Sequence, residues 1–429
     1  MKLNNKRTVT VGLAFMSICA FWQVYDGIVP LILKNTFGVS DTAAGVVMAM
    51  DNVLALFMLP LFGTLSDKTR TRWGRRMPFI VIGTLLASTA MLLIPLGDHF
   101  NNLPLFIIGL GLVLVAMATY RSPAVALMPD VTPKPLRSKA NAIINLMGAV
   151  GGIIMLLAIK LMVPKTDHPD YIPLFVLTIA IMALCVAYLF FKINEPKTVA
   201  LMEEESRAMG VEEEIVSEAD GAASEKMPKD VFRSLCFILA SVFLWFMGYN
   251  AVTTAFSKYA SFRWGMQGGD YALVLMIAQA AAIVTYIPVG IIASKIGRKR
   301  TILIGVAMLG VAFGAGAIFT SFSGLIFLFF SLAGMGWAFI NVNSYPMVVE
   351  MSRGADVGKY TGYYYTFSMT AQIITPILSG AVMQFLGYEY LFPYGALFVL
   401  ASFVTMLFVH HGDSRPEAKK GIEALDVDD

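Results

Sequence analysis

Charge is what this 429-residue sequence has least of. Charged residues make up 14% of the chain, and 57% of its residues are hydrophobic. Ordinary soluble domains carry about 25% charged and about 45–50% apolar residues. A soluble core cannot hide so much apolar surface, and the mean hydropathy of +0.70 predicts an integral membrane protein. The net charge of +3 gives no indication of nucleic-acid binding, and the bilayer is the expected environment.

Cysteine and histidine are also scarce. Cys19, Cys185 and Cys236 lie far apart in apolar stretches without CxxC spacing, so we interpret them as packing residues and expect no metal, disulfide or cofactor. The four histidines lie in loops or at the end of the last apolar stretch, which leaves no buried histidine to relay protons. HExxH, GxSxG and P-loop patterns are absent, so we do not expect an enzyme.

What the sequence has instead is long apolar runs. A helix needs about 20 mostly apolar residues to cross the hydrocarbon. Twelve such runs predict an all-α membrane protein with spans at 9–33, 42–65, 77–97, 103–128, 139–162, 172–191, 232–256, 271–293, 301–320, 324–349, 359–386 and 390–409. The first is too long for the apolar region of a signal peptide, so we expect it to stay as the first helix.

The basic residues predict the orientation. If both termini are cytoplasmic, 26 of the 32 basic residues fall on the cytoplasmic side. Loops on that side carry an excess of Lys and Arg. Five basic residues then fall outside, and one lies within a span. We therefore expect a multi-pass protein of the cell (inner or plasma) membrane with both termini in the cytoplasm.

The longest polar loop divides the spans six and six. It covers 192–231, is acidic, and is interpreted as a flexible or partly helical tether, with a regulatory binding segment as the alternative. The expected parts are an N-terminal six-helix half (1–191), the tether (192–231), a C-terminal six-helix half (232–412) and a cytoplasmic tail (413–429).

One basic motif occurs at the same place in each half. GTLSDKTRTRWGRRMP covers residues 63–78, and its echo GIIASKIGRKR covers 290–300. Two equivalent halves are typical of alternating-access carriers whose binding site lies between them. In such a motif glycine allows close helix approach, and the acid can meet a partner helix end as a conformational latch. The predicted latch residues are Gly63, Asp67, Arg75, Arg76, Gly290 and Arg298.

The motif at 63–78 resembles the helix 2–3 signature of the major facilitator superfamily. Its spacing, GxxSDxxxxxxGRRxP, is similar to that of the sucrose–proton and glycoside–pentoside–hexuronide symporter branches, as is ALMPDVTPKPLRSKANAIINLMGAVGG at 126–152. The resemblance implies two pseudo-symmetric six-helix halves and proton-coupled symport of a sugar, such as sucrose or maltose, by a monomer. The alternatives are a carrier of another polar metabolite coupled to sodium or another cation, and a non-transporting membrane sensor.

The sequence departs from this family pattern in two places. Ser294 stands where the second copy of the motif would have its Asp, so a carboxylate latch should be asymmetric. The middle of the second span reads ALFMLP, without the paired acids usual in the glycoside branch, which argues against a sodium site of the melibiose-carrier type.

Charges inside the spans are the candidate coupling residues, because a charge in hydrocarbon costs several kcal/mol. Asp26 and Asp51 should lie at similar depth, where two carboxylates would share a proton or hold a cation. Arg121 should lie too low to meet Asp26, and its candidate partners are Asp130, an acid of another helix end or substrate hydroxyls. The resemblance to sucrose carriers implies a coupling role for Asp130, whose place at a helix end also fits a structural role.

Aromatic and amide side chains on the predicted cavity helices complete the candidate site. Sugars need flat stacking surfaces and neutral hydrogen-bonding groups, although each residue could instead pack or join helices. The predicted substrate-binding residues are Trp22, Tyr25, Asn145, Tyr249, Asn250, Gln279, Trp337, Asn341 and Gln372.

Overall fold

The computed structural model describes residues 3–133, 136–166, 168–208, 228–351 and 357–413. Within these ranges the chain is helical and contains no strand. The helices are α1 (Asn5–Asn35), α2 (Asp41–Lys68), α3 (Met77–Met91), α4 (Leu93–His99), α5 (Leu103–Asp130), α6 (Arg137–Met162), α7 (Ile172–Lys192), α8 (Glu195–Ala208), α9 (Lys229–Phe262), α10 (Asp270–Ile296), α11 (Arg298–Gly316), α12 (Leu325–Val349), α13 (Val357–Phe385) and α14 (Leu391–Leu407), with a short 3₁₀ turn at Tyr388–Tyr390.

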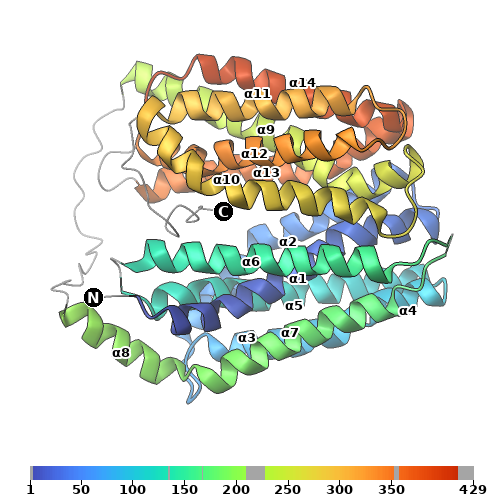
Figure 1. Ribbon diagram of the computed structural model, residues 1–429. Coiled ribbons are helices and arrows are strands. Elements are labelled where there is room, and N and C mark those ends of the chain that lie inside the picture. The colour runs from blue at the N-terminus through green and yellow to red at the C-terminus, as the bar shows by residue number, and fades with distance from the viewer. Residues whose placement is uncertain (1–2, 134–135, 167, 209–227, 352–356, 414–429) are drawn as a thin grey trace.

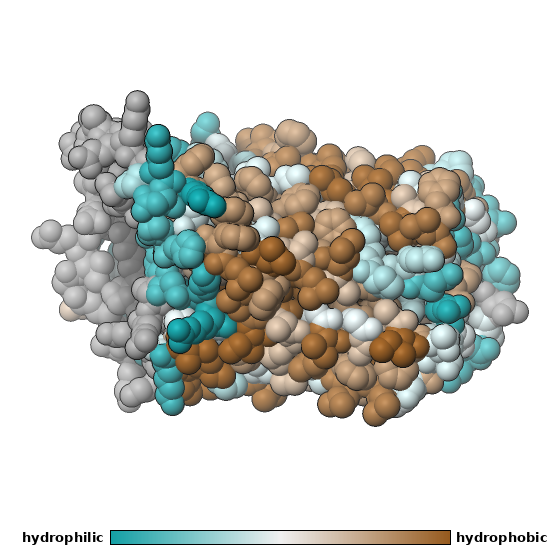
Figure 2. Space-filling view, turned by 90° about the horizontal axis from the view of Figure 1, so that it is seen from above, coloured by the Kyte–Doolittle hydropathy of each residue, from teal (hydrophilic) through white to brown (hydrophobic). Residues whose placement is uncertain are grey.

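Among the described residues, twelve spans are long and apolar enough to cross a membrane, which confirms the prediction of an all-α membrane protein. Helices α3 and α4 together form the third span, Met77–His99. An apolar belt crosses the middle of the molecule in Figure 2, with polar residues at both ends. The largest boundary difference is in the seventh span, which was expected to end at 256 and continues to Phe262.

The spans form two groups, α1–α7 and α9–α14, which lie one above the other in Figure 1. Within the first group α1 packs on α6, and within the second α11 packs on α12. The groups meet where α2 packs on α13, α6 on α10 and α1 on α9. The α2–α13 approach is close, because a methyl group added at Gly45 would overlap the backbone carbonyl of Pro376.

Ion pairs join the two groups at one end of the bundle. We call this the distal end, and the opposite end, where α1 begins and α14 ends, the α8 end. At the distal end, Asp41 accepts hydrogen bonds from Lys258 and Tyr388 of the second group, both at 3.0 Å. Asp270 of α10 pairs in the same way with Lys160 and Lys165 of the first group.

The pair Asp41–Lys258 explains the longer seventh span. Lys258 is 4% exposed and Asp41 is 2% exposed. A buried ammonium is tolerated when a buried carboxylate neutralises it, so α9 can carry Lys258 inside the protein. Because breaking such a pair leaves an uncompensated buried charge, these contacts stabilise the arrangement in which the two groups meet at the distal end.

The predicted tether begins with a helix. Helix α8 occupies its first part, and Glu205 of α8 forms an ion pair at 2.7 Å with Arg7 at the start of α1. Residues 209–227 of the tether, and the predicted tail beyond Asp413, lie outside the described residues. The domain boundaries therefore stay a prediction.

Candidate functional site

Two adjoining cavities lie between the two groups of helices. The first, of about 420 Å³, is called the arginine cavity because Arg121 lines it. The second, of about 330 Å³, is called the aspartate cavity because Asp26 lines it. Three residues of α10 line both cavities: Gln279, Ala282 and Tyr286. Each volume lies in the range of small-molecule sites.

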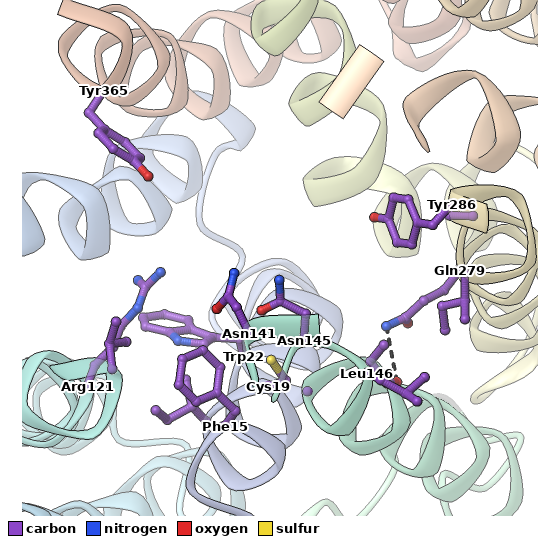
Figure 3. Close-up of a pocket in the computed structure, with 16 residues that line it drawn as sticks. Phe15, Cys19, Trp22, Arg121, Asn141, Asn145, Leu146, Gln279, Tyr286 and Tyr365 are labelled. Atoms are coloured by element: carbon purple, nitrogen blue, oxygen red, sulfur yellow. Dashed lines mark hydrogen bonds between the residues drawn. The ribbon is translucent and has the colours of Figure 1, made fainter. Parts of the chain in front are cut away.

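The arginine cavity is built mainly from α1, α6 and α10, with Arg121 and Val125 of α5. Its polar wall consists of Asn141 and Asn145, which share one face of α6 by their i, i+4 spacing. Trp22 supplies an aromatic surface, and the guanidinium carbon of Arg121 lies 5.9 Å from the centre of its ring. Figure 3 shows both asparagines and Arg121 pointing into the same open space, with Tyr365 of α13 across from Arg121.

Arg121 is solvent-exposed in this cavity. Its guanidinium group makes no hydrogen bond or ion pair with the described residues, and it interacts electrostatically with Asp51. Five unused N–H donors on a planar group can bind hydroxyl, carboxylate or phosphate oxygens. The arginine cavity is therefore equipped to donate hydrogen bonds.

The aspartate cavity is built mainly from α9, α10 and α12. Tyr249 and Trp337 stack in parallel, with their ring centres 3.8 Å apart and their planes 6° apart. Phe246 packs edge-on against Trp337 at 5.3 Å. Asn341 lies on the same stripe of α12 as Trp337 and also lines the cavity. The stacked pair leaves no room for a ligand between its rings, so a ligand would lie against the assembled pair.

Three charged residues interact at the boundary between α1, α2 and α5. Asp51 lies within electrostatic reach of both Asp26 and Arg121. The Asp51 carboxylate accepts hydrogen bonds of 2.6 and 2.7 Å from the backbone and side chain of Asn52. Two acids and one arginine leave a single excess negative charge when all are ionised. Binding one cation or proton would neutralise the set.

Three of the predicted substrate residues do not line either cavity. Tyr25 is 1% exposed, and its hydroxyl finds no hydrogen-bond partner among the described residues. Asn250 follows Tyr249 directly, so its side chain points about 100° away around the helix. Gln372 donates a hydrogen bond to the backbone carbonyl of Ser368, one turn earlier on α13, at 3.4 Å.

The structure adds residues that the sequence analysis did not single out. Gln23 and Thr253 both line the aspartate cavity. Helical spacing could have identified both residues, since Gln23 precedes Asp26 by three residues and Thr253 follows Tyr249 by four. Both positions therefore share a helix face with a residue already expected at the site.

The motif at 63–78 forms a charge network at the α8 end. Arg76 pairs with Asp67 and, at 2.8 Å, with Asp130. Arg75 pairs with Asp130 at 2.7 Å. Asp130 was one of the partners considered for Arg121, and the structure gives it these two arginines instead. Gly63 lies close to α5, where an added methyl group would come within 3.0 Å of the Ser122 hydroxyl.

A carboxylate from the following helix completes this network. Glu195, the first residue of α8, is 1% exposed. It accepts backbone hydrogen bonds from Arg75 (2.8 Å), Arg76 (3.0 Å) and Met77 (2.8 Å) at the start of α3. The first N–H groups of a helix have no partner within it, and no side chain of its own sequence caps α3. Glu195 supplies that cap and a favourable charge.

The second half repeats the arrangement with other residues. Asp413 accepts a hydrogen bond of 2.8 Å from the backbone N–H of Lys299, at the start of α11. Arg298 pairs with Glu350 at the end of α12, as Arg75 pairs with Asp130 at the end of α5. At Gly290 an added methyl group would meet open space. Ser294 donates a hydrogen bond to Ile291 of its own helix.

Glycine is required at one position in each copy. Gly74 and Gly297 have φ angles of 108° and 89°, which L side chains rarely adopt. A methyl group at Gly74 would also overlap the Glu195 carboxylate, and one at Gly297 would crowd Asp413. The two glycines therefore let the chain turn closely enough for each carboxylate to reach a helix N-terminus.

The sequence matches a known protein family over most of its length. The sequence model described as the Major Facilitator Superfamily matches residues 11–281 and 239–426. A sucrose transport protein, SUC3 of Arabidopsis thaliana, is 31% identical in an alignment 139 residues long that covers 28% of this chain and 23% of that protein. The match thus spans about a quarter of that relative's length.

Solved structures share the fold at low sequence identity. The nucleoside transporter NupG superposes with a TM-score of 0.68 at 14% identity, covering 95% of this chain and 99% of that one. An inward-open structure of the xylose transporter XylE from E. coli superposes with a TM-score of 0.66 at 16% identity, covering 98% of both chains.

Proposed function

The chain belongs to the Major Facilitator Superfamily, and on that basis we propose that it is a secondary active transporter that carries a sugar together with a proton. The sugar is a disaccharide or glycoside such as sucrose or maltose, and the carrier works by alternating access as a monomer. The observation that carries the proposal is the pair of cavities between the halves, which combines stacked aromatic rings, neutral amides and hydroxyls with the acid Asp26. Asp26 interacts electrostatically with Asp51, which lies outside the cavity lining. The partial match to a sucrose transport protein supports the sugar class.

The geometry suggests how the cycle proceeds. The ion pairs of Asp41 and Asp270 hold the distal end closed, so substrate exchanges at the α8 end in this state. Closing the α8 end would bring the cavity walls together around the substrate and remove water from Asp26 and Asp51. Unneutralised charges are costly in such an occluded site, so a proton on the acid pair favours the transition. This dependence would couple sugar movement to the proton gradient.

Sugar uptake tests the proposal directly. Proteoliposomes with an acid exterior should concentrate labelled sucrose or maltose, and a protonophore should abolish the accumulation, because the proton gradient is the proposed driving force. An equal sodium gradient without a pH difference should give no accumulation. Sodium-driven uptake would contradict proton coupling, and failure of every disaccharide and glycoside in a panel would contradict the sugar class.

We also propose that the α8 end faces the cytoplasm. The support is the excess of basic residues in loops at that end and the location of Lys68, Arg70 and Arg72 there, all exposed. In intact cells, single cysteines at Asn101 and Glu389 should react with an impermeant thiol reagent, and a cysteine at Thr71 should react only after permeabilisation. Labelling at Thr71 in intact cells would reverse the proposed orientation.

A further inference from the structure

The two cavities differ in depth. Along α1, which runs from the α8 end to the distal end, Phe15, Cys19 and Trp22 line the arginine cavity, and Asp26 lines the aspartate cavity. Helix α6 runs in the same direction and shows the same order, with Asn141 before Leu156. The aspartate cavity therefore lies deeper, behind the arginine cavity as seen from the α8 end.

Both halves line both cavities, but Trp22 and the stacked pair Tyr249–Trp337 come from different halves. Trp22, Arg121 and the two asparagines of the arginine cavity come from α1, α5 and α6. The stacked pair Tyr249–Trp337 of the aspartate cavity comes from α9 and α12. Each cavity thus has its own aromatic surface, Trp22 from the first half in one and Tyr249–Trp337 from the second half in the other. Between them, Gln279 and Tyr286 of α10 border both spaces, and Gln279 donates a hydrogen bond of 3.3 Å to the Ala149 carbonyl of α6.

Each cavity also has its own charged group with a distinct role toward hydroxyls. Arg121 offers only donors, whereas the Asp26 carboxylate offers acceptors when it is ionised. A pyranose or furanose ring has a weakly polar C–H face for an aromatic surface and a rim of hydroxyls that donate and accept. Each cavity provides an aromatic surface and a charged group of its own. Each could therefore bind one sugar ring without the other cavity.

From this arrangement we infer that the substrate site consists of two one-ring subsites in series: a deep subsite on Tyr249–Trp337 beside Asp26, and a shallow subsite on Trp22 beside Arg121. The inference rests on the proposed sugar transport and narrows the substrate to two-ring sugars, with the glycosidic bond near Gln279 and Tyr286. A two-ring sugar contacts the aromatic surfaces of both halves at once, whereas a single ring contacts only one of these surfaces. A ligand shifts a conformational equilibrium only through differential affinity for the two states, so the two-ring sugar is the better trigger for closure.

Calorimetric titration of purified protein with matched sugars tests the inference. Maltose and sucrose are compared with glucose, fructose and methyl glucoside, in the parent protein and in Trp22→Ala and Trp337→Ala. The parent should bind one of the disaccharides about tenfold tighter than its monosaccharide parts, equivalent to about 1.4 kcal/mol for the second ring. Trp22→Ala and Trp337→Ala should each remove that advantage and weaken the disaccharide about tenfold, whereas monosaccharide affinity should change about twofold at most, because the other subsite still holds one ring.

Control variants distinguish the loss of a sugar contact from misfolding of the protein. Trp22→Phe and Trp337→Phe keep an aromatic face and should restore part of the lost affinity, and each Ala variant is titrated below its own unfolding temperature, which lost packing should lower. Equal affinity of the parent for one-ring and two-ring sugars, or equal loss of both in Trp22→Ala, would overturn the two subsites while leaving sugar transport standing. Absence of binding by every sugar in the panel would instead reject the proposed function, and the subsites with it.

Discussion

Replacing Asp51 by Asn should abolish proton-driven accumulation of sugar while leaving sugar exchange across the membrane measurable. Asp51 lies within electrostatic reach of Asp26 and Arg121, and one proton would neutralise this group of charges. An asparagine keeps the size and hydrogen-bonding capacity of the side chain but is permanently neutral, so the loaded and empty carriers no longer differ by a proton. The internal-to-external sugar ratio should fall to unity under a pH gradient.

Asp26→Asn should behave in the same way, because the two acids would share the coupling proton. The experiment compares gradient-driven uptake with counterflow, in which labelled sugar exchanges for unlabelled sugar without any gradient. Glu204→Gln is the matched control, since it neutralises an exposed acid on α8, far from the cavities. It should accumulate sugar as the parent does.

Asp130→Asn distinguishes proton coupling by the Asp26–Asp51 pair from proton coupling by Asp130. In this structure Asp130 pairs with Arg75 and Arg76 and lines neither cavity, which favours a structural role. The neutral variant should therefore yield less folded protein but keep coupling in the fraction that folds. Loss of accumulation with normal folding in Asp130→Asn alone would move the coupling role from the acid pair to Asp130. If all three variants still concentrate sugar, neither account survives.

Replacing Glu195 by Ala should cause the largest loss of stability among single substitutions at the α8 end. Its carboxylate is the acceptor for the backbone N–H groups of Arg75, Arg76 and Met77. Each buried donor left without a partner costs about 1–3 kcal/mol, so the free energy of unfolding should fall by about 3 kcal/mol or more. The thermal midpoint of the detergent-solubilised protein should drop by several degrees.

Glu195→Gln and Glu203→Ala serve as controls for this loss. Glutamine keeps one acceptor oxygen and should recover part of the stability, which distinguishes lost capping from lost packing. Glu203 is exposed on the same helix, and its removal should leave the midpoint unchanged. A midpoint for Glu195→Ala equal to that of Glu203→Ala would show that the cap contributes nothing to stability.

The part of the site that could be predicted from the sequence is the part in which helical periodicity determines which residues share a face. Trp22, Tyr25 and Asp26 share one face of the first span by their i, i+3, i+4 spacing, and two of them, Trp22 and Asp26, line the cavities. Tyr25 has that spacing but does not line either cavity, and neither does Asn250, which was expected at the site only as the neighbour of Tyr249. Each is adjacent in sequence to a lining residue, and a helix turns adjacent side chains about 100° apart.

The sequence by itself determined the architecture. Twelve apolar runs of this length must form twelve membrane-spanning helices, because in a bilayer each backbone polar group has to be hydrogen-bonded within its own helix. The repeated motif also located the equivalent turns of the two halves, at 63–78 and 290–300. These features depend on local composition, so no long-range contact is needed to find them.

Only the tertiary structure decided which distant groups meet. Lys258 counted as an external loop residue until Asp41, 217 positions away, proved to neutralise it inside the protein. Glu195 and Asp413 carry no local sign of capping a helix, since the N–H groups they serve belong to another part of the chain. Ion pairs and caps of this kind are set by helix packing, which brings together residues whose separation in sequence contains no periodic signal.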